Sequence, residues 1–115
     1  MSDVAKINQE LADLSKKLAM ASNEYSDACK EAATHRSDYD VARAKAMLKS
    51  ALKTATERQA EATIACESVM RDARISEAMR DALKERIRAL ESVLNACQTR
   101  ASFLKAEMTL TGQNY

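Results

Sequence analysis

The most regular pattern in the chain is a row of apolar residues that recur at alternating spacings of four and three in its C-terminal third. This row, which we call the C-terminal seam, consists of Leu83, Ile87, Leu90, Leu94, Cys97, Ala101, Leu104 and Met108. Such spacings repeat every seven residues and place all eight on one face of a helix, as in packed or supercoiled helices. Because a lone helix cannot bury this face, we expect it to pack on another helix of the chain, on a second copy, or on a partner protein.

A second regular row, the N-terminal seam, begins close to the start of the chain. It consists of Val4, Ile7, Leu11, Leu14, Leu18, Ala21, Tyr25, Ala28 and Ala32. Four heptads without a slip indicate a coiled coil, and Ser2 or Asp3 is suited to cap its first turn. The register continues through His35, Tyr39 and Ala42. A somewhat rotated apolar stripe is then expected at Val41, Ala44, Leu48, Leu52 and Ala55, so we predict one long helix over residues 1–53.

Two shorter signals divide the rest of the chain. Thr56-Glu57-Arg58-Gln59 has the spacing of a capping box, which predicts a short helix over residues 56–71. Its apolar face is less regular and comprises Ala60, Ala62, Ile64, Ala65, Val69 and Met70. We expect an interruption between Asp72 and Ser76, a last helix over residues 76–111, and a tail over 112–115 in which Gly112 ends the helix.

The composition supports a fold made of helices alone. The chain has no proline, one glycine, and only 3% aromatic residues, so helix breakers are almost absent and a core of large side chains would be thin. We therefore predict a single all-α domain in which long helices form an elongated helical hairpin or coiled coil that is oligomeric. The expected oligomer interface is Leu83, Ile87, Leu90, Leu94, Cys97, Leu104 and Met108.

The candidate chemistry argues against an enzyme. Cys29, Cys66 and Cys97 are far apart in the sequence, and His35 is the only histidine, so neither a metal site nor a catalytic base is indicated. Phosphate-binding and nucleophile motifs are absent as well. We expect no cofactor, no metal and no small-molecule substrate. The polar N-terminus and the lack of a long apolar run predict a cytoplasmic protein without membrane association.

The charge distribution is more informative than the net charge of +1. Residues 36–58 hold six basic residues against three acidic ones, and residues 41–53 hold no acid. Lys45, Lys49 and Lys53 follow at i, i+4 and i+8 on one helical stripe, which a phosphate backbone would complement. The expected DNA-binding set, called here the basic set, is Arg36, Arg43, Lys45, Lys49, Lys53 and Arg58, with Tyr39 able to stack on a base. The alternative is an ordinary solvated face.

Three short motifs lie along the C-terminal helix: Leu94-Asn95-Ala96, Thr99-Arg100 and Leu104-Lys105. In these motifs and their spacing, residues 39–108 resemble the recombination mediators of the UvsY type from tailed phages. Lys45-Ala46-Met47-Leu48 is similar to that family's element for single-stranded DNA, although Met47 replaces an arginine. The resemblance implies a ring-forming homo-oligomer that binds single-stranded DNA and assists recombinase loading. It also implies a recombinase and a single-strand-binding protein as partners, and a C-terminal helix that supports assembly.

A second hypothesis follows from the seams alone. A structural or adaptor coiled coil, such as a phage scaffold, chaperone or secretion accessory protein, would use the N-terminal seam to bind a partner helix. In that case the basic set would only keep the helix solvated. The sequence leaves both hypotheses open.

Overall fold

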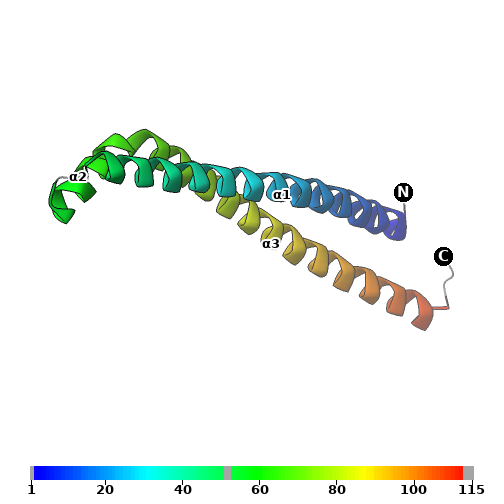
Figure 1. Cartoon of the computed structure of the whole chain (residues 1–115). Coiled ribbons are helices and arrows are strands. Elements are labelled where there is room, and N and C mark those ends of the chain that lie inside the picture. The colour runs from blue at the N-terminus through cyan, green and yellow to red at the C-terminus, as the bar shows by residue number, and fades with distance from the viewer. Residues whose placement is uncertain (1, 51–52, 113–115) are drawn as a thin grey trace. The chain divides into compact units, whose positions relative to one another are not determined.

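The computed structural model describes residues 2–50 and 53–112, and nearly all of them lie in three α-helices. These are α1 (Asp3–Lys49), α2 (Ala55–Ala65) and α3 (Glu67–Leu110), shown in Figure 1. The described residues contain no strand. The predicted all-α fold with long helices is confirmed.

Helix α1 begins and ends at residues suited to the helix dipole. The hydroxyl of Ser2 accepts a hydrogen bond from the backbone N–H of Ala5 at 3.1 Å, and Asp3 lies in the first turn. Lys49 lies in the last turn, where a cation is favourable. The helix was predicted to extend to residue 53, but Lys53 lies in a bend after α1 has ended.

Helix α2 begins with a different cap from the one predicted. Thr54, rather than Thr56, is its N-cap, and the Thr54 hydroxyl accepts a hydrogen bond from the N–H of Glu57 at 3.2 Å.

The break between α2 and α3 lies earlier than predicted. Cys66 separates the two helices, with φ of −103°. Hydrogen bonding nevertheless continues across it, because the N–H of Met70 donates to the Cys66 carbonyl at 2.9 Å.

The expected interruption between Asp72 and Ser76 is therefore wrong, since α3 runs through this segment without a break. Helix α3 ends at Leu110, and Gly112 follows with φ of +74°, a conformation that favours glycine. The helix was expected to end at residue 111, so it ends one residue earlier than expected. The rest of the predicted tail, residues 113–115, lies outside the described residues.

The chain divides into two compact units, which we describe separately. One unit combines the first part of α1, up to Glu24, with α3 from Leu83 onward. The other is Tyr25–Ala82 and contains the rest of α1, all of α2 and the start of α3. Within each unit the helices run antiparallel. In the first, Glu10 pairs with Arg100 and Glu24 with Arg86.

In the first unit the two predicted seams face each other. Val4, Ile7, Leu11, Leu14 and Leu18 of α1 are all half-buried, and so are the C-terminal seam residues of α3 apart from Cys97. Ala21 and Cys97 are the most deeply buried, each with 1% of its surface exposed. The C-terminal seam, which we expected to form the oligomer interface, therefore has a partner inside the chain.

The core of the second unit is built mostly from small side chains. Tyr39, Cys66 and Ala73 form its centre, and Ala42, Ala46, Val69 and Met70 pack against them. Burial contributes roughly 0.8 kcal/mol per methylene, so alanine adds little and the few larger side chains matter more. This core continues the spacing of the N-terminal seam through Ala46.

The rotated stripe predicted near the end of α1 is wrong. Val41, Ala44 and Leu48 are exposed, with 75% of the Leu48 surface open to solvent, and Ala55 is exposed at the start of α2. Leu52 lies outside the described residues. The side chains that face the core are Ala42 and Ala46, and Ser50 is buried beyond the end of the helix.

Candidate functional site

The basic set is divided between different faces and does not form one stripe. Helical residues advance by about 100° each, so Arg36 and Arg43 share one face of α1, whereas Lys45 lies about 200° away from Arg43. Lys45 and Lys49, four residues apart, share the second face. The stripe expected to continue to Lys53 ends with α1 at Lys49.

Arg36 is held within the second unit by contacts across the helix pair. It forms an ion pair with Glu77 of α3, and its guanidinium lies 5.4 Å from the centre of the Tyr39 ring. Its Nη1 also approaches the sulfur of Met70 at 4.0 Å. The hydrogen bond to Glu77 raises the pKa of Arg36 above its ordinary value. These contacts join α1 to α3, so this cation has a structural role.

Tyr39 is enclosed in the core rather than presented to a ligand. Only 9% of its surface is exposed, and its hydroxyl accepts a hydrogen bond from Nη1 of Arg43 at 3.4 Å. A base cannot stack on a ring that already lies between two helices and beneath Arg36. The expected stacking role of Tyr39 is therefore wrong.

Lys53 and Arg58 lie around the connection between α1 and α2. Lys53 forms an ion pair with Glu61, and the Ser50 hydroxyl donates a hydrogen bond to the same carboxylate. These hydrogen bonds, first from Lys53 and then from Ser50, lower the pKa of Glu61, and Glu61 in turn raises the pKa of Lys53. Arg58 is half-buried and has an interaction of its own. Lys53 thus ties the connection to α2.

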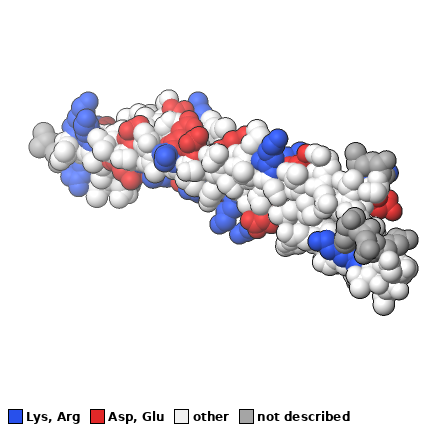
Figure 2. Space-filling model, turned by 90° about the vertical axis from the view of Figure 1, so that its right-hand side faces the viewer, with Lys and Arg blue, Asp and Glu red and all other residues white. Residues whose placement is uncertain are grey.

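Lys45 and Lys49 are the members of the basic set that remain available for contact with a ligand. Both are exposed, and neither forms an ion pair or hydrogen bond within the part of the chain that the structure describes. They lie in the last two turns of α1. On the face drawn in Figure 2, basic and acidic side chains are interspersed, and no continuous basic band runs along it.

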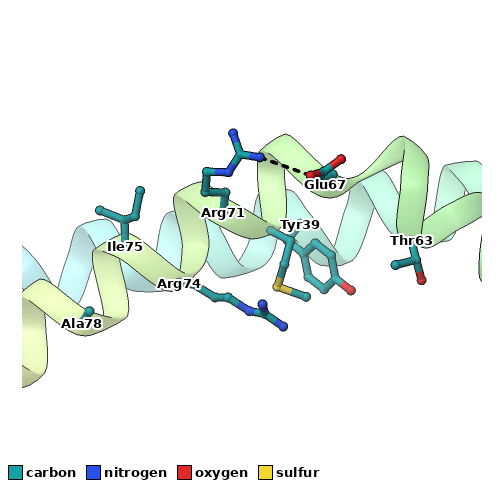
Figure 3. A pocket seen from close by; sticks show the side chains of 8 residues that line it. Tyr39, Thr63, Glu67, Arg71, Arg74, Ile75 and Ala78 are labelled. Carbon is teal, nitrogen blue, oxygen red and sulfur yellow. Dashed lines mark hydrogen bonds and ion pairs between the residues drawn. The ribbon is translucent and has the colours of Figure 1, made fainter.

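A shallow groove lies beside Tyr39 on the second unit. Its volume is about 440 Å³, and Tyr39, Met70, Arg74 and Ile75 are among the residues that line it. Figure 3 shows Arg74 and Tyr39 extending to the same side of α3, away from Arg71. Arg71 pairs with Glu67 at 3.2 Å.

Sequence reasoning missed Arg74 as a neighbour of Tyr39. The two are 35 positions apart in the sequence. The antiparallel pairing of α1 with α3 brings them together, and that pairing depends on where the chain turns. The only sequence signal for this contact was that both seams continue toward the connection between α1 and α3.

A polar pair is embedded in the same unit. Nδ1 of His35 and the hydroxyl of Ser76, which is buried, are hydrogen-bonded across α1 and α3.

In residues 2–50 and 53–112, no group of three or more His, Cys, Asp or Glu side chains is placed to hold a metal ion. Across the same residues, no helix is both long and apolar enough to cross a membrane.

Comparison of the chain with protein-family models, with curated proteins and with solved structures finds no match. The functional argument therefore depends on the residues themselves.

Proposed function

We propose that this protein binds single-stranded DNA as a homo-oligomer and assists the loading of a recombinase. The observation that carries the proposal is the exposed pair Lys45 and Lys49, which has no carboxylate partner among the described residues. It lies within the acid-free segment of residues 41–53. Cations with no partner in the protein gain most from a phosphate backbone, because binding releases the counterions of the nucleic acid.

The number of such cations explains why an oligomer is part of the proposal. Two lysines in one subunit bind a nucleic acid weakly, whereas the same pair repeated over several subunits adds through effective concentration. The resemblance of Lys45-Ala46-Met47-Leu48 to a single-stranded-DNA element supports the same assignment.

Fluorescence anisotropy with a labelled oligonucleotide over a salt series tests the DNA contact. We expect Lys45→Ala/Lys49→Ala to weaken binding and to flatten the dependence of log affinity on log salt by about 1.4, since each single-strand phosphate contact contributes about 0.7. Lys16→Ala/Lys17→Ala is the matched control, because it removes two exposed lysines from the other unit.

An affinity that does not change with salt would contradict the DNA contact. Equal loss of binding in the two double variants would show a general charge effect instead of a site at Lys45 and Lys49.

A second candidate function is a structural or adaptor coiled coil that binds a partner protein. It is favoured by large apolar side chains that α3 leaves exposed, such as Val93 and Phe103, of which 52% and 67% of the surface is open. An adaptor of this kind would retain its partner in the Lys45→Ala/Lys49→Ala variant and would purify with that partner free of nucleic acid. A DNA-binding protein would instead purify with nucleic acid, and the Lys45→Ala/Lys49→Ala variant would carry less of it.

A further inference from the structure

Helix α3 carries a second apolar row on the face that α1 leaves open. One heptad position is apolar in six successive heptads, which hold Ile75, Ala82, Ala89, Ala96, Phe103 and Leu110. Within the first unit this row, together with Val93, forms what we call the outer stripe: Ala89, Val93, Ala96, Phe103 and Leu110. All five are exposed.

The outer stripe lies about 100° from the C-terminal seam, because four of its five members, all but Leu110, directly precede a seam residue. Helix α1 covers the seam and leaves the stripe in solvent. Phe103, the only phenylalanine of the chain, is 67% exposed, and Leu110 is 88% exposed. Large apolar side chains exposed along one face of a helix are a feature of interaction surfaces.

We propose that the C-terminal part of the outer stripe, Ala96, Phe103 and Leu110, is an interface between two copies of this chain, packed antiparallel about a two-fold axis at Phe103. The charges that flank the stripe identify the second copy as the occupant. Arg100 and Glu107 lie on the same face, on either side of Phe103. A two-fold axis at Phe103 places Arg100 of each copy opposite position 106 of the other, one residue from Glu107, so the surface is complementary to itself.

Both charged residues are available for this contact. Glu107 is exposed and forms no ion pair with any described residue. Arg100 donates from Nη2 to Glu10 at 2.6 Å, but a guanidinium has five N–H donors, and the remaining donors can reach a second carboxylate.

The charges also select one register of the two helices. At the axis we propose, Phe103 faces its own equivalent and Ala96 faces Leu110. A shift by one heptad would seat Phe103 on Ala96, but it would place Arg100 within one residue of Arg100 of the second copy. Like charges at this position disfavour the shifted register.

This interface deepens the proposed function, because it repeats Lys45 and Lys49 in one assembly, but it is tested without DNA. Sedimentation equilibrium of the full chain is expected to show a dimer. Phe103→Asp is expected to weaken dimerisation by at least about tenfold, as for an anchor side chain at the centre of an interface. Leu48→Asp is the matched control, since Leu48 is also a large, exposed apolar residue but lies in the other unit.

A wild-type chain that stays monomeric at every concentration would overturn the interface. So would a Phe103→Asp variant that associates as tightly as the wild type. Circular dichroism of each variant verifies that the helices are retained. Failure of DNA binding in the anisotropy experiment would leave a measured dimer standing, so a failure of the DNA contact can be distinguished from a failure of the interface.

A charge exchange tests the register. Arg100→Glu and Glu107→Arg should each dimerise more weakly than the wild type, because each brings like charges together at both ends of the axis. An equimolar mixture should recover association through mixed dimers. A mixture that associates no better than its components would overturn the antiparallel register.

Discussion

Tyr39 shows how much a single large side chain matters in a core made mainly of alanine. Its ring fills the space between α1 and α3, where its neighbours include Ala42, Ala46 and Ala73. Its hydroxyl and its ring face also position Arg43 and Arg36. A residue expected to contact a ligand is instead the anchor of one unit.

Tyr39→Ala should therefore lower the free energy of unfolding by about 2–4 kcal/mol, since the alanines around it cannot fill the cavity. Leu48→Ala, at an exposed position, should change that free energy by less than about 0.5 kcal/mol. Urea denaturation followed by circular dichroism measures both. Equal effects would contradict the assignment of Tyr39, rather than Leu48, to the core.

Glu61 gives the connection between α1 and α2 a dependence on pH. Its pKa is lowered from 4.5 by hydrogen bonds from Lys53 and Ser50. A carboxyl group with a depressed pKa in the folded state stabilises the fold above its ordinary pKa, and this stabilisation is lost as pH falls through the folded pKa.

We expect the Glu61 carboxylate to titrate below 4.5 when followed by NMR. Glu61→Gln should melt at a lower temperature than the wild type near neutral pH, and the difference should vanish below the folded pKa. Glu91→Gln, an exposed change in the other unit, serves as control. A midpoint at or above 4.5 would contradict the hydrogen-bonding role of Glu61.

At the scale of the helices, both seams extend further than their apolar residues indicate. The C-terminal seam continues backward through Arg80, Ser76, Ala73, Val69 and Cys66 at the same alternating spacings, and all five are buried or half-buried. The polar residues at two of these positions hid the continuation, so the sequence suggested a break between Asp72 and Ser76.

The long regular seams could be predicted from the sequence, because large apolar residues at heptad spacing can be buried only along one face. The end of α1 could not, because Val41 and Leu48 are more apolar than the alanines that the core actually uses. Small side chains allow the helices to approach closely, and that gain depends on the partner helix. The separation of Arg36 and Arg43 from Lys45 and Lys49 follows from helix periodicity alone. The contacts of Arg36 with Glu77 and Met70 became clear only once the pairing of α1 with α3 was known.

Ala73 tests the continuity of α3 directly. It is 0% exposed, so Ala73→Asp would bury an uncompensated charge between the helices. We expect a loss of at least about 3 kcal/mol in the free energy of unfolding. Ala78→Asp makes the same change at an exposed position of the same helix and should have little effect. Thermal melts of the two variants that coincide would contradict the seam described for α3.

At the scale of the whole molecule, each antiparallel helix pair satisfies its seams internally and leaves other features of α1 and α3 open. These are the unpaired Lys45 and Lys49 on α1 and the outer stripe on α3. The proposed function uses both features, the first for contact with DNA and the second to repeat that contact in an assembly. Neither feature is needed to hold the helices together.

The mass of the full chain in solution, with and without a single-stranded oligonucleotide, tests this account most directly. Without the oligonucleotide, analytical ultracentrifugation at low salt should show a species heavier than a single chain. With the oligonucleotide, it should show a still heavier complex that contains the oligonucleotide and releases it as the salt concentration is raised. A single-chain mass in both samples, with the oligonucleotide sedimenting separately, would contradict the proposal that this protein works as a DNA-binding assembly.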